Sequence, residues 1–215
     1  MQAVGICIAD CMSFLRWFVQ GNKAKEPDLT EFVSALAAGS GARLMLEVCA
    51  DSAGPTTLAL IAAAHQTGGR VACIVRGPDE LHASLEALGR DAGRVDLVVG
   101  DARHLLLGEY RGADFVLVDC ALEDHERVFG AAQLGAMEAC GGVVVGHNAF
   151  CESSWPSGDA LGGLRVDLLP IGGGLRVSRV PPAGKRSQWV VRIDECTGEE
   201  HVFRITSPRK KWIEA

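Results

Sequence analysis

The sequence lacks several features that mark common classes of protein. It has no C-x-x-C pair, although 8 of its 215 residues are cysteines, and it has no G-x-G-x-x-G fingerprint of a dinucleotide site. It also lacks an excess of positive charge, because its formal net charge is −6. Nucleic-acid binders depend on cations that neutralise phosphates, so we expect no nucleic-acid partner.

The N-terminal segment, residues 1–18, lacks the marks of a signal peptide or a membrane span. It has no basic start, Asp10 interrupts its apolar residues and Arg16 follows them. We expect an amphipathic helix here that covers a sheet edge, and no membrane partner. Three cysteines stand in or beside apolar segments, which favours reduced, buried thiols and a cytoplasmic protein. They are Cys49, Cys73 and Cys140.

Apolar runs alternate with helical patterns along most of the chain. The apolar runs are near-continuous stretches of Val, Ile and Leu, typical of a parallel sheet with helices on both faces. We therefore expect one domain over residues 1–215 with an α/β, Rossmann-like, doubly wound and mostly parallel sheet. The strands are expected at 43–48, 71–75, 95–99, 114–119 and 141–146, and the helices from Asp28 with Glu31 in a capping box, at 56–66 and 78–89, from Ala102, and at 123–139.

The pattern changes after Phe150. Residues 166–180 read as two antiparallel strands joined by a glycine turn, and residues 187–205 read as a further hairpin. The expected core therefore covers about 28–180, with an appended hairpin at 184–206. The last hairpin offers an edge that could pair with a second chain in a homodimer.

Polar residues follow the expected strands, where a doubly wound sheet binds its ligands. Glu47 precedes the next helix by nine residues and cannot cap it, whereas Asp101 could contact a ligand or simply cap the next helix. His147 could be a base or a hydrogen-bonded structural histidine. The polar residues at the five strand ends are Glu47, Arg76, Asp101, Asp119 and the pair His147 and Asn148.

Five segments resemble the motif series of class I S-adenosylmethionine-dependent methyltransferases, most closely the catechol-type O-methyltransferases. They are "LMLEVCADSAGPTT", "VDLVVGDARHLL", "ADFVLVDC", "GGVVVGHNAF" and "VDLLPIGGGLRV". The segments "EFVSALAAG", "HQTGGRVACIV" and "CTGEEHVFR" also resemble a plant family of unknown function in that superfamily. The resemblance implies a seven-stranded sheet, S-adenosylmethionine as cofactor and a small-molecule methyl acceptor.

The resemblance also implies roles for individual residues. Glu47 would bind the ammonium of the methionine moiety, Gly54 would let the backbone approach, and the helix start at Thr56 and Thr57 would offer N–H groups to the carboxylate. An early glycine of the motif is Cys49 here. Asp101, Ala102 and Arg103 match the segment along the adenine.

The chain departs from the catechol-type pattern at further places. Arg76 follows the second strand, where an acid normally holds the ribose, although Asp79 could substitute. Asp119 and Asn148 match two metal positions, but His147 replaces the aspartate at a third. The set could hold a transition metal but makes a poor Mg²⁺ site, and we expect no metal. The family's lysine falls near Leu122, which leaves His147 as general base, with Asp119 beside it.

Three functions remain open on the sequence alone. The first is methyl transfer to a small acceptor, for example a phenolic hydroxyl, and the second is a non-catalytic binding or regulatory role for a methyltransferase-like fold. The third and weakest is a nucleotide site in which Arg76 binds the 2′-phosphate of NADP. Residues 151–163 could line an acceptor pocket in which Trp155 stacks on a ring, or Trp155 could be a packing anchor.

Overall fold

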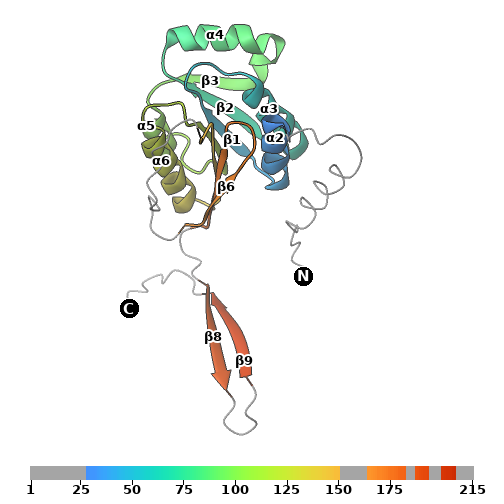
Figure 1. Cartoon of the computed structure of the whole chain (residues 1–215), viewed down its shortest axis with the longest axis vertical. Helices are drawn as coiled ribbons and strands as arrows, with labels where there is room; N and C mark the ends of the chain where they lie inside the picture. Colours follow the sequence, from blue (N-terminus) through green and yellow to red (C-terminus); the bar gives the residue numbers. More distant parts are fainter. Residues whose placement is uncertain (1–27, 151–163, 183–186, 194–199, 207–215) are drawn as a thin grey trace, which may run out of the picture.

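The structure is a computed structural model that describes residues 28–150, 164–182, 187–193 and 200–206. Its core is a seven-stranded sheet with helices on both faces (Figure 1). The expected N-terminal helix and the expected acceptor segment with Trp155 lie outside the described residues. Within the described part of the chain, no helix has the length and apolarity that crossing a membrane requires.

The sheet has the strand order β3-β2-β1-β4-β5-β7-β6. The first five strands run parallel, whereas β7 lies antiparallel between β5 and β6. This confirms the expected α/β class, the mostly parallel sheet and its antiparallel C-terminal strands. The strands are β1 (Leu44–Val48), β2 (Arg70–Val75), β3 (Val95–Val99), β4 (Phe115–Asp119), β5 (Gly142–His147), β6 (Val166–Leu169) and β7 (Leu175–Val180).

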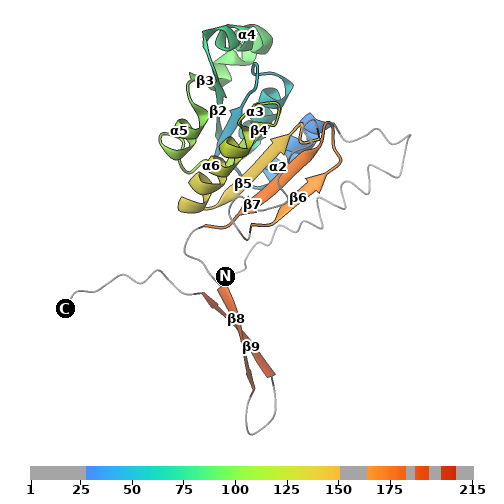
Figure 2. The ribbon, with the colours of Figure 1, turned by 60° about the vertical axis from the view of Figure 1, so that its left-hand side comes forward.

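The helices form two layers, which Figure 2 shows on either side of the sheet. One face of the sheet packs against α2 and α3 through residues such as Val33 and Leu60. The other face packs against α5 and α6 through Leu106 and Phe129. The helices are α2 (Leu29–Gly39), α3 (Pro55–Thr67), α4 (Pro78–Leu88), α5 (Ala102–Leu107) and α6 (His125–Glu138), and the 3-10 helix η1 (Gly89–Arg94) follows α4.

The helix boundaries follow local chemistry. Asp28 caps α2 by accepting a hydrogen bond from the Thr30 N–H at 3.0 Å. Proline at the first position starts α3 at Pro55, one residue before the expected start, because proline has no N–H to leave unpaired. Gly68 ends α3 with φ of 67°, a conformation that glycine adopts without strain.

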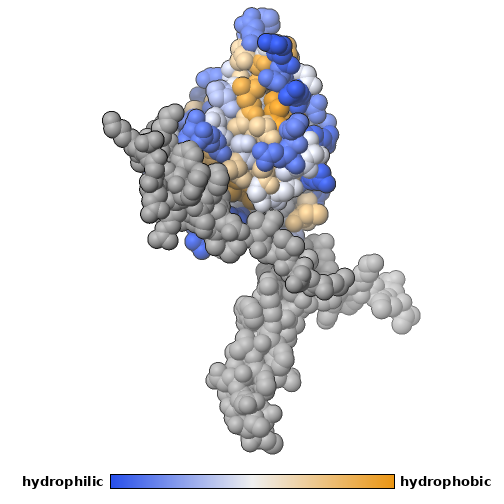
Figure 3. Space-filling view, turned by 90° about the vertical axis from the view of Figure 1, so that its right-hand side faces the viewer, coloured by the Kyte–Doolittle hydropathy of each residue, from blue (hydrophilic) through white to orange (hydrophobic). Residues whose placement is uncertain are grey.

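Apolar side chains are not confined to the interior. Leu58 on α3 and Leu85 on α4 are 39% and 46% exposed. Figure 3 shows the side of the molecule that lies to the right in Figure 1, where apolar residues form a patch bordered by hydrophilic ones.

The last two strands, β8 (Ser187–Ile193) and β9 (Glu200–Thr206), pair with each other in a separate two-stranded sheet. The expected hairpin is therefore present. Its role as an appendage to a core at 28–180, and the homodimer that its edge could form, stay predictions.

Candidate functional site

Three polar side chains lie on one face of the sheet at the carboxyl ends of neighbouring parallel strands. Glu47 of β1 is in register with Leu117 of β4, and Asp119 of β4 is in register with His147 of β5. Neighbours in register point to the same face, and side chains alternate along each strand. Glu47, Asp119 and His147 therefore lie on the α2–α3 face, as the sequence predicts for a polar crevice.

Glu47 is a buried carboxylate, only 1% exposed. One oxygen accepts a hydrogen bond from the Thr56 hydroxyl and the other from the Thr57 hydroxyl, each at 2.5 Å. Burial raises the pKa of Glu47 to about 6, because desolvation outweighs the two hydrogen bonds, and the nearby negative charge of Asp119 adds to the increase. Among the described residues, no Arg or His forms an ion pair with it.

The start of α3 is tied to Glu47. Gly54 is the N-cap of this helix and has no side chain to cap it. Its N–H instead donates to the Thr57 hydroxyl at 3.0 Å, and that hydroxyl donates to Glu47. A Cβ at Gly54 would have open space around it. The sequence indicates Thr56 and Thr57 for their backbone N–H groups but not for their hydroxyls.

Asp119, His147 and Asn148 form a second polar group beside Glu47. The Asn148 amide donates to Asp119 Oδ1 at 2.9 Å, and His147 Nε2 lies 3.9 Å from the same oxygen. Asn148 has φ of 59°, and its Oδ1 lies so close to Gly173 that a Cβ there would approach it to 2.9 Å. The glycine turn before β7 therefore packs closely against Asn148, and a larger residue at Gly173 would displace it.

His147 is 8% exposed. Burial lowers its pKa below the ordinary histidine value, although the charge of Asp119 and a hydrogen bond with Asn148 oppose the decrease. Its Nδ1 is buried and has no hydrogen-bond partner among the described residues. A neutral imidazole beside a carboxylate can accept a proton, which suits a general base.

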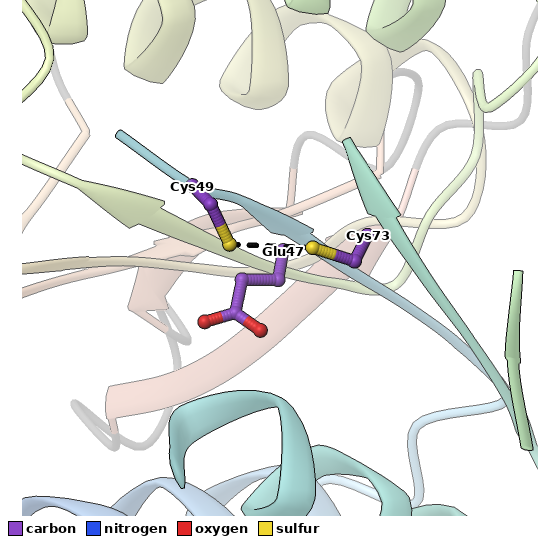
Figure 4. Close-up of side chains that lie close together, drawn as sticks. All are labelled: Glu47, Cys49 and Cys73. Carbon is purple, nitrogen blue, oxygen red and sulfur yellow. Dashed lines mark hydrogen bonds between the residues drawn. The ribbon is translucent and has the colours of Figure 1, made fainter. Parts of the chain in front are cut away.

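Cys49 turns toward β2, as Figure 4 shows. Its sulfur lies 3.2 Å from the sulfur of Cys73, and both residues are buried. The burial predicted for these two thiols is confirmed. The prediction of a buried thiol is wrong for Cys140, which is exposed because it lies in the turn between α6 and β5.

The end of β2 carries no acid. Val75 is buried, whereas Arg76 and Asp79 are exposed. In the first turn of α4, Glu80 folds back so that its Oε2 lies 2.9 Å from where a Cβ of Gly77 would be. Glu80, and not Asp79, is therefore the acid that folds back over this turn.

Ser84 of α4 makes a contact with the loop after β1 that the sequence does not indicate. It is fully buried, and its hydroxyl accepts a hydrogen bond from the Ala53 N–H at 2.9 Å. The same hydroxyl donates to the Glu80 carbonyl at 2.6 Å. Ser84 thus fixes the loop between β1 and α3, and a serine within a helical pattern gives no sequence signal for such a contact.

Asp101 is the N-cap of α5. It accepts a hydrogen bond from the His104 N–H at 2.8 Å, and its side chain is exposed. Arg103 lies within 4.0 Å of Asp101 and Asp124, and Ala102 is half-buried. The structure thus confirms that Asp101 caps α5, which was one of the two roles expected for it. Its contact with adenine stays a prediction.

A groove of about 760 Å³ lies between α5 and α6. Asp101 and Arg103 line it together with Leu107 and Leu134, whereas Glu47, Asp119 and His147 do not. We place the candidate site at the strand ends and not in the groove, because the buried titratable groups gather there.

Comparisons with known proteins agree with this fold. A putative caffeoyl-CoA O-methyltransferase from Staphylococcus aureus aligns with a TM-score of 0.57 and 13% identity over 83% of this chain and 93% of its own. An SAH-bound methyltransferase from Podospora anserina aligns with a TM-score of 0.59 and 16% identity over 84% of this chain and 98% of its own. At such identities, the likeness shows a shared Rossmann-like methyltransferase fold. Among curated proteins, no significant match was found.

One family model covers most of the chain. It matches residues 14–205, which include the whole seven-stranded sheet, β8 and all of β9 except its last residue. The likeness to plant proteins and to catechol-type enzymes stays a prediction. The chain belongs to the family described as "Protein of unknown function (DUF1442)".

Proposed function

We propose that this protein is an S-adenosylmethionine-dependent methyltransferase that acts on a small-molecule acceptor. The observation that carries the proposal is the buried carboxylate of Glu47 at the end of β1, joined to the first turn of α3. The fold shared with methyltransferases supports it, as do two structural neighbours, from Podospora anserina and Bacillus cereus, that contain bound SAH.

The residues present fit the amino-acid part of this cofactor. Glu47 has no cationic partner among the described residues, so an ammonium group would offset the cost of its burial. The first turn of α3 begins after Gly54, which has no capping side chain, so the N–H groups of Thr56 and Thr57 suit a carboxylate. The open space at Gly54 leaves room for close approach.

The other proposed cofactor contacts come from neighbouring loops. Cys49 stands between Glu47 and the loop that leads to α3, and Arg76 stands at the end of β2. Asp101, Ala102 and Arg103 begin α5 after β3. We assign Cys49 and Arg76 to the edges of the cofactor site, and the start of α5 to the segment along the adenine.

When bound, the cofactor would supply an electrophilic methyl group. The chain would supply a proton acceptor for the nucleophile, and His147 is suited to this because burial keeps it neutral near neutral pH. Asp119, 3.9 Å from His147 Nε2, would stabilise the imidazolium that forms. This arrangement favours an acceptor with a weakly acidic proton, such as a phenolic hydroxyl.

The test uses the full-length protein and S-adenosylmethionine with a labelled methyl group. Simple phenols, catechols and hydroxycinnamoyl thioesters are offered as acceptors, with a thiol and an amine as controls. Label should appear on a phenolic oxygen, and it should appear about 10²- to 10⁴-fold more slowly with His147→Ala. Label that transfers to no acceptor would contradict the proposed enzyme activity.

A non-catalytic binding protein is the second candidate. The observation that favours it is the end of β2, where Arg76 is exposed and no acid directly follows the strand. Tight binding of S-adenosylhomocysteine without transfer to any acceptor would favour this function.

A further inference from the structure

The face of the sheet beneath α3 holds three side chains of the kind that bind metal ions. Glu47, Cys49 and Cys73 each offer a ligand atom, and these atoms lie within 4.8 Å of one another. All three residues are buried. Figure 4 shows the two sulfurs facing each other beside Glu47. Glu47 of β1 is in register with Cys73 of the adjacent strand β2, and Cys49 follows β1 directly.

The spacing of these atoms is close to what a tetrahedral ion requires. Two thiolates at about 2.3 Å from a Zn²⁺ are about 3.8 Å apart in a tetrahedral arrangement. The sulfurs of Cys49 and Cys73 are 3.2 Å apart, so a small outward movement would admit the ion. Binding would release the two thiol protons to solvent.

The surroundings of the cluster also suit a cation. Thr56 and Thr57 hold both oxygens of Glu47, which is how outer contacts orient a metal-binding carboxylate. Asp119, on the same face of the neighbouring strand, adds negative charge. Among the described residues, no Arg pairs with either carboxylate.

We propose that Glu47, Cys49 and Cys73 form a binding site for a thiophilic divalent cation such as Zn²⁺ or Cd²⁺. Two thiolates and one carboxylate select such ions over Mg²⁺ and Ca²⁺, which prefer oxygen ligands alone. Three protein ligands leave one tetrahedral position for water. The site shares Glu47 and Cys49 with the proposed cofactor site, so an ion held here would compete with the cofactor's ammonium group, whereas the metal titration itself requires neither cofactor nor methyl transfer.

The test titrates the reduced, full-length protein with Cd²⁺ and follows the sulfur-to-cadmium charge-transfer absorbance in the ultraviolet. The wild-type protein should bind one ion at this site. Cys49→Ser and Cys73→Ser should each weaken binding at least tenfold and reduce the band. Thr57→Val should weaken it roughly 10- to 100-fold, because it removes an outer contact of a ligand, whereas Thr57→Ser should not.

The matched controls are Cys140→Ser, which changes an exposed thiol, and the double variant Cys7→Ser with Cys11→Ser. Both should bind Cd²⁺ like the wild type. An unchanged band in the Cys49 and Cys73 variants, or no band in the wild type, would overturn the proposal.

A second measurement keeps the test decisive if the core variants fail to fold. X-ray absorption of the wild-type protein with one equivalent of Zn²⁺ should show two sulfur ligands and oxygen ligands at the remaining positions. Fewer than two sulfurs, or coordination by nitrogen and oxygen only, would overturn the proposal.

Discussion

The two ends of β4 carry an aspartate each, and the two carboxylates differ in their partners. Asp114, just before the strand, accepts hydrogen bonds from the backbone N–H groups of Arg43 and Leu44 at 2.9–3.0 Å. Asp119, at the carboxyl end, accepts from the Ala121 N–H at 3.0 Å and from the Asn148 side chain at 2.9 Å, and His147 lies 3.9 Å away.

The difference separates structural acids from candidate functional ones. Both oxygens of Asp114 are bonded to the backbone where β1 begins, so this acid aligns the two strands. Asp119 faces a histidine and lies within electrostatic reach of Glu47. The carboxyl end therefore brings two acids and a histidine together, whereas the acid at the amino end is bonded to the backbone.

The largest effect is expected from His147→Ala. Loss of a general base reduces turnover by about 10²- to 10⁴-fold. The affinity for S-adenosylhomocysteine should hardly change, since the base acts on the acceptor and not on the sulfonium. Steady-state rates measure the loss of turnover, and calorimetry on the same preparations measures the affinity for S-adenosylhomocysteine.

The pH profile sharpens this prediction. A base must be neutral to accept a proton, and burial lowers the pKa of His147. Turnover should therefore persist to pH values below about 6.5, the ordinary histidine pKa, and then fall as one group protonates. A profile that falls well above that value would assign the base to another residue.

Glu47→Gln should change how stability depends on pH. The pKa of Glu47 is raised from 4.5 to about 6, so the folded state disfavours the ionised form. As pH rises through this interval, wild-type stability should decrease relative to the variant by about 2 kcal/mol, at 1.36 kcal/mol per pKa unit. Urea unfolding at pH 4 and pH 7.5 measures the difference, and parallel curves would contradict it.

A pair of substitutions tests the two ends of β4 directly. Asp114→Ala should lower the free energy of unfolding by about 1–2 kcal/mol, because it leaves two backbone N–H groups without their acceptor. Asp119→Ala should cost less, since its loss also relieves repulsion with Glu47. Denaturant unfolding of both variants checks the order, and a larger loss for Asp119→Ala would reverse our interpretation.

Metal removal should have the smallest effect on methyl transfer. His147 takes the place of an oxygen ligand beside Asp119 and Asn148, and a hard cation prefers oxygen ligands. Transfer should survive EDTA and should not respond to added Mg²⁺. Activity that returns only with Mg²⁺ after chelation would reinstate a metal mechanism.

The sequence predicted the features that depend on the order of apolar and polar residues along the chain. Continuous apolar runs identified five parallel strands, and their ends pointed to Glu47, Asp119 and His147, which the structure brings to one face. Contacts between distant segments were not predictable in this way. The hydroxyls of Thr56 and Thr57 on Glu47, the hydrogen bond from Ala53 to Ser84, and the approach of Cys49 to Cys73 all depend on how α3, α4 and β2 pack around the loop after β1.

Calorimetry with S-adenosylhomocysteine tests the central claim most directly, with NADPH and coenzyme A titrated in parallel. We predict that only S-adenosylhomocysteine binds, and that Glu47→Ala weakens it roughly 10- to 100-fold through loss of a charge-assisted contact worth about 1.5–3 kcal/mol. Asp114→Asn, at the other end of the sheet, should leave the affinity unchanged. Binding that is unaffected by Glu47→Ala, or that occurs with NADPH instead, would contradict the account.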